Sequence, residues 1–149
     1  MKFAALATVL FASSLPALAQ QPPLKPEKQI ELRQSAYALM GYNFGSLAQM
    51  AQEKKPYNKE EATRNADFVA MLSDVPKGFF GEGTDKGHDT KAKPEVWQKR
   101  ADFDAKMDKM IQETKKLPAA ARADLAALKK AVGDTGAACK ACHDDYKNK

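Results

Sequence analysis

Apolar residues recur at alternating spacings of three and four along most of this chain, which is the period of an amphipathic α-helix. Four helices are expected: from Pro26 or Glu27 to before Pro56, from Asn58 to Asp74, from Pro94 to Pro118, and from a start between Ala119 and Asp124 to Tyr146. No alternation of period two is long enough for a sheet. Because short links join the first helix to the second and the third to the fourth, the sequence predicts an all-α, antiparallel four-helix bundle.

Local signals support these helices. Asn58 with Glu61 three residues later is typical of a variant capping box. Arg33 interrupts the apolar stripe of the first helix, and an arginine on a buried face needs a partner. The stripes of the last two helices are Val96, Arg100, Phe103, Met107, Met110, Thr114 and Leu117, then Leu125, Leu128, Val132, Thr135, Cys139, Cys142 and Tyr146.

One long loop is expected, over residues 77–93, which hold four of the eight glycines. Long loops in compact domains are commonly functional or mobile. His88 lies in this loop and is expected to be a solvated histidine, not a metal ligand.

The last helix carries Cys139-Lys140-Ala141-Cys142-His143, and C-x-x-C-H is the attachment signature of a c-type haem. Three residues apart on a helix, the two thiols share one face and can both add to the haem vinyl groups. His143 is placed to ligate the iron as the proximal ligand. Because the cysteines continue the core-facing stripe, we expect covalently bound haem c in the bundle core, with Gly133 and Gly136 leaving room for it.

Three other readings of the motif remain. A structural disulfide suits an exported chain, but a two-residue spacer on a helix gives poor disulfide geometry. Zinc prefers four ligands, whereas this chain has two Cys and two His, with His88 far away in the loop. A thioredoxin-like redox pair belongs to a βαβ unit, and no such unit is expected.

The first residues, Met1 to Ala19, have the pattern of a signal peptide: a basic start, a short apolar run and Ala17-Leu18-Ala19. Cleavage is expected before Gln20, which leaves residues 20–149 as one mature domain. A membrane anchor is the alternative, but the apolar run is short and no basic stop-transfer cluster follows. Haem attachment through thioethers takes place outside the cytoplasm in bacteria, so both signals predict a periplasmic protein.

The 149 residues include 24 Lys and Arg and 19 Asp and Glu, for a formal charge of +5. Removing residues 1–19 deletes one lysine, which leaves 23 basic against 19 acidic side chains, or +4. Two haem propionates lower this to about +2. The lysines are spread along the chain, which argues against a nucleic-acid partner.

Three segments make the chain similar to a known family: Cys139 to Tyr146, Arg33-Gln34-Ser35-Ala36, and Pro94-Glu95-Val96-Trp97. Over essentially the whole mature chain it resembles the bacterial cytochromes c′, which are periplasmic four-helix-bundle haem proteins. The specific feature is the position of the motif at the end of the last helix, since ordinary small c-type cytochromes carry it near the N-terminus. The resemblance implies one covalent haem c.

The resemblance also implies a five-coordinate, high-spin iron with His143 as its sole axial protein ligand. Tyr37, one turn beyond Arg33, is then the distal residue that blocks the sixth position; otherwise it is an aromatic that touches only helices. Arg33 and Gln34 match family positions that hold a propionate, although a solvated helix residue is the alternative for Arg33. Thr90 matches the place where, in relatives, the loop before Pro94 approaches the haem edge.

Lys147, four residues after His143, matches a basic family position near the proximal face. The alternative is a lysine of a frayed tail. Family members are commonly homodimers through their first two helices. In this chain the first two helices carry more large apolar side chains than one core-facing stripe on each requires. These are Phe44, Met50, Phe68 and Met71.

The expected function is binding of NO and CO, with discrimination against O2, together with one-electron cycling. No acid–base pair or nucleophile accompanies the motif, so turnover chemistry is not indicated. One alternative is a low-spin electron carrier with Met40 as the sixth ligand, although a core role is the commoner use of such a Met. Another is an NO-scavenging or peroxidase-like enzyme.

Overall fold

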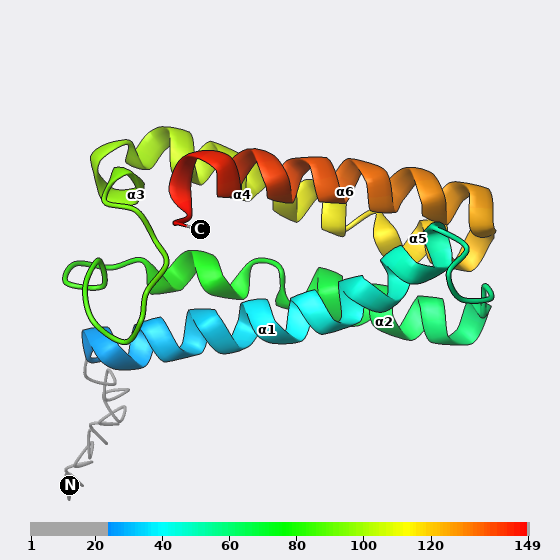
Figure 1. Ribbon diagram of the computed structural model, residues 1–149, viewed down its shortest axis with the longest axis horizontal. Coiled ribbons are helices and arrows are strands. Elements are labelled where there is room, and N and C mark those ends of the chain that lie inside the picture. Colours follow the sequence, from blue (N-terminus) through cyan, green and yellow to red (C-terminus); the bar gives the residue numbers. More distant parts are fainter. Residues whose placement is uncertain (1–23, 149) are drawn as a thin grey trace, which may run out of the picture.

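The computed structural model describes residues 24–148, and the expected signal peptide lies outside this range. The elements are α1 (Pro26–Ala51), α2 (Lys59–Leu72), the 3₁₀ helix η1 (Val75–Phe79), α3 (Glu95–Gln98), α4 (Arg100–Thr114), α5 (Leu117–Ala123) and α6 (Leu125–Tyr146). Figure 1 shows the long helices running side by side, with the start of α1 and the end of α6 at the same end of the molecule. The predicted all-α class is confirmed.

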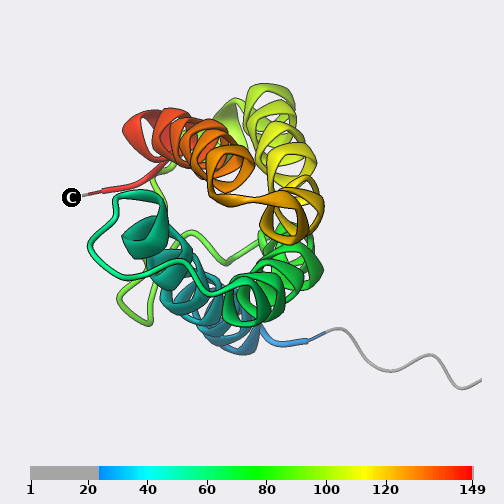
Figure 2. The same cartoon turned by 90° about the vertical axis from the view of Figure 1, so that its right-hand side faces the viewer.

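The long helices form four sides around a common core. α1 packs against α2 and α6, α4 packs against α6, and α5 packs against both α2 and α6. The helices α3, α4 and α5 together make the third side, so the bundle has four sides when it is viewed along its axis (Figure 2). Within residues 24–148, no helix combines the length and the apolar character that a membrane span requires.

The third side departs from the prediction of one continuous helix. The backbone leaves the helical region at Lys99, with φ −118° and ψ 46°, and this divides α3 from α4. Arg100 is exposed instead of belonging to the buried stripe, and its Nη1 donates to the Phe80 carbonyl at 2.9 Å. Pro118 lies in the first turn of α5, where a missing N–H costs nothing.

Side-chain caps define two of the helix starts. Asn58 accepts the Glu61 N–H at 2.9 Å, as predicted for α2. The Glu61 carboxylate does not return to Asn58, because it accepts from Ser46 at 2.9 Å and Lys55 at 2.5 Å. Asp124 caps α6 by accepting the N–H three residues later at 2.8 Å, so the fourth helix starts at the late edge of its predicted range.

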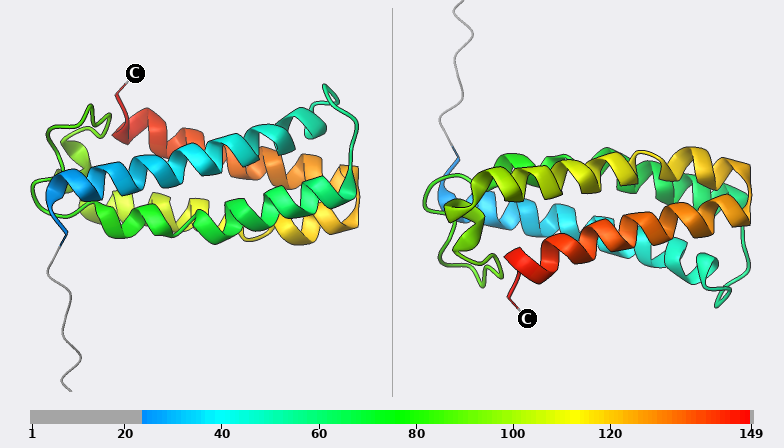
Figure 3. Two further views of the ribbon diagram at one scale, coloured as in Figure 1. Left: turned by 90° about the horizontal axis from the view of Figure 1, so that it is seen from below. Right: turned by 90° about the horizontal axis from the view of Figure 1, so that it is seen from above.

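The core has two halves of different character. One half, called here the packed end, is closed by small and aliphatic side chains: Leu47, Met50, Ala62, Ala66, Val69, Leu117, Ala121, Leu128, Ala131 and Val132. The other half, the cavity end, is built from larger residues: Met40, Phe80, Val96, Phe103, Met107, Met110, Ile111, Ala138, Cys142 and Tyr146. Figure 3 shows that the loop before α3 lies at the cavity end, near the end of α6.

Candidate functional site

The cavity end contains a cavity of about 530 Å³ that opens to solvent. Its walls are mostly apolar and come from α1, α4, α6 and the loop before α3. The residues singled out from the sequence that line it are Arg33, Gln34, Tyr37, Met40, Thr90, Cys139, Cys142, His143 and Lys147. The fold therefore brings together residues that lie more than a hundred positions apart in the sequence.

The two cysteines face this cavity as free thiols. Cys142 is buried and Cys139 is half-buried. Burial raises the pKa of the Cys139 thiol, and it raises the pKa of Cys142 to about 11. Both groups are therefore protonated at neutral pH, the form whose S–H bond adds across a vinyl C=C bond to give a thioether.

The other readings of the motif find little support here. Cys139 and Cys142 are not joined to each other. Across residues 24–148, no cluster of three or more His, Cys, Asp and Glu side chains is arranged to hold a metal ion. His88 is exposed in its loop and is not among the residues that line the cavity. The same part of the chain contains only helices and one isolated bridge, not a βαβ unit.

His143 follows Cys142 directly and lines the cavity while its outer side is exposed. Desolvation beside the cavity lowers the pKa of the imidazole, and the positive charge of Lys147 lowers it further. The imidazole is thus kept neutral, which is the form that ligates a metal. Lys147 is the residue after the end of α6 and shares the cavity wall.

Tyr37 reaches from α1 towards α4. Its hydroxyl donates to Sδ of Met107 at 3.4 Å. Burial raises the pKa of the phenol far above its ordinary value, so the group remains protonated. Met40, three residues further along α1, is also buried and lines the same cavity.

Arg33 is buried, with 3% of its surface exposed, so the alternative of a solvated helix residue is wrong. Its Nη1 donates to the Phe79 carbonyl and to Thr84 Oγ1, both at 2.9 Å. Its Nη2 donates to the Thr84 carbonyl and to Thr90 Oγ1, both at 2.7 Å. The guanidinium also lies over the Phe80 ring, 4.5 Å from its centroid. All four hydrogen-bond partners are neutral, so the buried cation has no carboxylate among them.

The glycines that leave space differ from those expected. Gly133 is exposed and Gly136 half-buried, neither lines the cavity, and a Cβ at either would meet no atom within 4 Å. The expectation that these two make room for haem is wrong. Gly41, one turn beyond Tyr37, lines the cavity, and a Cβ there would meet no atom within 4 Å. Of these three glycines, the one that lines the cavity therefore belongs to α1.

Two buried threonines add to the site. Thr84, fully buried, is a partner of Arg33 that the sequence did not reveal, because the loop carries no motif that marks it. Thr135 belongs to the predicted stripe of α6 and lines the cavity. Its Oγ1 is the one buried side-chain oxygen or nitrogen without a hydrogen-bond partner in the described part of the chain.

These residues fit a haem. Two free thiols and a neutral imidazole open onto a mostly apolar cavity, and a buried cation paired only with neutral oxygens lies on the same wall. A porphyrin carrying two carboxylates matches that combination of apolar surface and positive charge. Fold and site together define a four-helix-bundle protein with a c-type haem.

The comparison with known proteins makes this specific. A family model described as Cytochrome C′ matches residues 28–147, and the chain belongs to this family. The cytochrome c′ of Rubrivivax gelatinosus is 49% identical over 126 residues, which cover 84% of this chain and 98% of the relative. A cytochrome c-554 of Cereibacter sphaeroides is 38% identical over 148 residues, covering 97% and 96%. The cofactor is accordingly haem c.

Solved structures agree with the fold. The crystal structure of cytochrome c′ from Rubrivivax gelatinosus superposes with a TM-score of 0.80 at 49% identity, and the match covers 83% of this chain and 98% of that one. A nitric oxide complex of a mutant cytochrome c prime from Alcaligenes xylosoxidans gives a TM-score of 0.78 at 40% identity, covering 86% and 99%. The predicted four-helix bundle is confirmed.

Proposed function

We propose that this chain is a periplasmic haem c protein that binds NO and CO at a five-coordinate iron and cycles one electron between ferric and ferrous states. One observation carries the proposal. Tyr37 and His143 line a single cavity from two different helices, and the Tyr37 hydroxyl is already engaged by Met107. A relative bound to nitric oxide supports the choice of ligand.

In this proposal, Cys139 and Cys142 would tether the haem through thioethers, and the neutral ring of His143 would ligate its iron. Arg33 and Gln34 would hold a propionate, and Thr90 would lie at the haem edge. Four of the five N–H groups of Arg33 donate hydrogen bonds to residues 79–90. The Nε–H and the positive charge are therefore available to a propionate. Lys147 adds positive charge beside His143.

Tyr37 determines what the sixth position accepts. A protonated phenol is a poor iron ligand, and burial keeps this one protonated. Its bulk raises the barrier for a ligand that binds upright, as CO does, and this slows such a ligand without excluding it. Because its O–H points to Met107, it gives bound O2 no hydrogen bond, and O2 depends on such a donor more than NO and CO do.

Optical spectra of the ferric, ferrous and CO-treated holoprotein test this function. We expect a high-spin ferric spectrum, a five-coordinate ferrous spectrum, and new bands with CO and with NO. A purely low-spin, six-coordinate ferric spectrum would overturn the proposal.

A low-spin electron carrier is the second candidate, because Met40 is buried and lines the cavity three residues from Tyr37. Ligation by its sulfur predicts an absorption band at the red end of the visible spectrum of the ferric protein. That band should disappear in the variant Met40→Leu. An NO-scavenging or peroxidase-like enzyme is distinguished by steady-state consumption of NO or peroxide with a physiological reductant.

The first residue of the mature chain tests whether the protein is exported. The signal peptide of residues 1–19 predicts a mature periplasmic chain that begins at Gln20. Intact-mass measurement of the holoprotein from a periplasmic fraction should give the mass of residues 20–149 plus one haem. A chain that keeps Met1 would contradict it.

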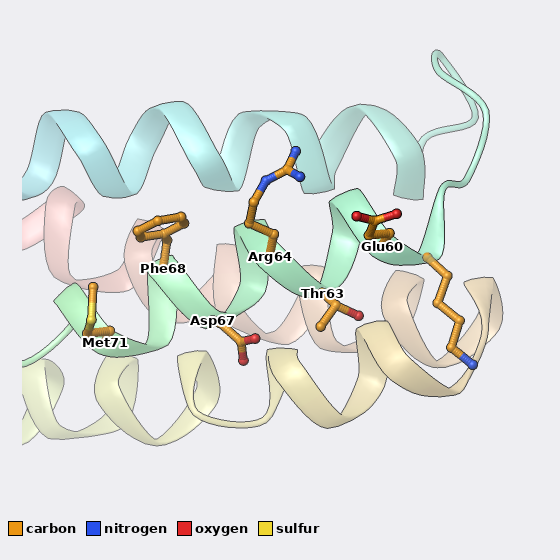
Figure 4. A pocket seen from close by; sticks show the side chains of 7 residues that line it. Glu60, Thr63, Arg64, Asp67, Phe68 and Met71 are labelled. Carbon is orange, nitrogen blue, oxygen red and sulfur yellow. The ribbon is translucent and has the colours of Figure 1, made fainter.

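A homodimer is proposed through α1 and α2, on a narrower set of residues than the sequence indicated. Met50 is completely buried and is not available at the surface, and Phe44 is half-buried and lines the cavity. Phe68 and Met71 are 44% and 61% exposed, and they line a groove on α2 beside charged residues (Figure 4). Sedimentation should give the dimer mass at micromolar concentration, and Met71→Glu should shift it to the monomer mass.

A further inference from the structure

The loop before α3 is held at both ends, and residues 79–93 are called here the strap. Arg33 fixes it at Phe79, Thr84 and Thr90 through four hydrogen bonds of 2.7 to 2.9 Å. Thr84 is fully buried and does not line the cavity. One buried side chain of α1 therefore anchors several points of the strap at once.

Gln34 holds the middle of the strap. Its Nε2 donates to the His88 carbonyl at 3.1 Å. Here Gly87, His88 and Asp89 have φ values of 80°, 46° and 49°, so two residues with side chains adopt left-handed backbone. Such conformations persist only where the surroundings impose them. The neighbouring contacts of Arg33 and Gln34 supply that constraint.

The last part of the strap is bonded to the end of α6. Ala92 and Lys147 form an antiparallel bridge, the Lys93 N–H donates to the Tyr146 carbonyl at 3.0 Å, and Asn148 N–H donates to the Lys91 carbonyl at 2.7 Å. These bonds surround the last turn of α6, which carries His143. Figure 3 shows the start of α1, the strap and the end of α6 at the same end of the bundle.

We propose that Arg33 is a positioning residue for His143 and acts through the strap: it fixes the strap near Tyr37, and the strap fixes the end of α6 against the cavity. The inference rests on the proposed function in one respect, the ligation of iron by His143. Arg33 thus connects the distal side of the site with its proximal side. This role is separate from any contact of Arg33 with a propionate.

Thr84→Val tests the coupling, because it removes an acceptor of Arg33 without altering a cavity-lining residue. Two readouts on the holoprotein are needed. The first is the iron–histidine stretching band of the ferrous haem in resonance Raman spectra, and the second is hydrogen exchange of the Lys93 and Asn148 amides. We expect the band to shift or broaden and the two amides to exchange about tenfold faster. Thr63→Val on α2 is the matched control and should change neither.

Two further variants keep the test decisive if Thr84→Val accumulates poorly. Arg33→Lys keeps the charge but loses the planar fork, so it should change both readouts in the same direction. A chain that ends at Lys147 lacks the Asn148 N–H that donates to the Lys91 carbonyl at the far end of the strap, and it should shift the same Raman band.

The outcomes separate this inference from the function on which it rests. Absence of an iron–histidine band in the unaltered protein refutes the ligation by His143. A normal band that stays unchanged in these variants overturns the role of the strap, whether or not the amides exchange faster.

Discussion

The Tyr37 hydroxyl donates to Sδ of Met107 at 3.4 Å, and this contact joins α1 to α4 inside the cavity end. A hydrogen bond to a thioether is weak, so the position of the ring depends mainly on packing. The effect of the Tyr37 ring's bulk can therefore be separated by mutation from the effect of its hydroxyl.

Replacing Tyr37 with Ala should open the distal side, whereas Phe keeps the bulk and removes only the hydroxyl. We expect CO to bind at least about tenfold faster to Tyr37→Ala, because a lowered steric barrier of about 1.4 kcal/mol gives that factor. Tyr37→Phe should stay within about threefold of the unaltered protein. Flash photolysis of the ferrous CO complex measures both rates. Equal rates in all three proteins would show that Tyr37 does not guard the iron.

Thr135→Val should stabilise the protein. The Thr135 hydroxyl is buried without a partner, and such a group costs on the order of 1 kcal/mol or more. We expect the variant to unfold about 4 °C higher. Thr114→Val is the control on α4, because that hydroxyl donates to the Ile111 carbonyl at 2.9 Å and its loss should lower the melting temperature. A lower melting temperature for Thr135→Val would mean that the hydroxyl has a partner in the holoprotein.

Glu113 should make the protein sensitive to acid. Hydrogen bonds from Lys109 and Lys116, both at 2.7 Å, lower the pKa of this carboxyl from its ordinary value near 4.5 to about 2. A lowered folded-state pKa contributes stability above pH 4.5, and this contribution is lost as the pH falls towards 2. Thermal unfolding from pH 6 to pH 2 should therefore show the difference between the unaltered protein and Glu113→Gln shrinking as the pH falls. The double variant Lys109→Ala/Lys116→Ala should behave like Glu113→Gln, and a constant difference across this range would exclude the pairing.

Removing the haem should unfold one half of the bundle more than the other. Without the haem, the mostly apolar walls of a cavity of about 530 Å³ are exposed to water, and the protein loses the hydrophobic stabilisation that contact with a porphyrin would give. We expect the cavity end to collapse or lose order in Cys139→Ala/Cys142→Ala purified without haem. Hydrogen exchange should stay slow around Leu128 at the packed end and become fast around Phe103 at the cavity end. Uniform protection would contradict the division of the core.

The sequence predicted the class of fold because the three–four spacing is nearly unbroken, and it predicted the haem motif because C-x-x-C-H has a strict chemical meaning. The break at Lys99 escaped prediction, since neither Pro nor Gly marks it. The expectation that Gly133 and Gly136 leave room for the haem was wrong for a related reason. Spacing along one helix does not show which glycine faces a cavity formed by several helices.

Arg33 shows the same limit within the site. Its place in an apolar stripe correctly indicated a buried charge in need of partners. Those partners are Phe79, Thr84 and Thr90, which lie about fifty residues away at the end of η1 and in the loop after it, where the sequence has no periodicity. The path of such a loop is set by tertiary contacts, so no local rule could name them. The same holds for Met50, whose burial depends on how α1 is rotated in the bundle.

The division of the core into the packed end and the cavity end has a consequence for how the sequence of such a protein can evolve. Substitutions among the tightly packed alanines and leucines alter the melting temperature while the cavity keeps its lining. Under the proposed function, substitutions at Tyr37 or Met40 alter the choice of ligand while the packed end preserves the fold. Stability and ligand choice thus depend on separate sets of side chains, and evolution can alter one set while the other stays the same.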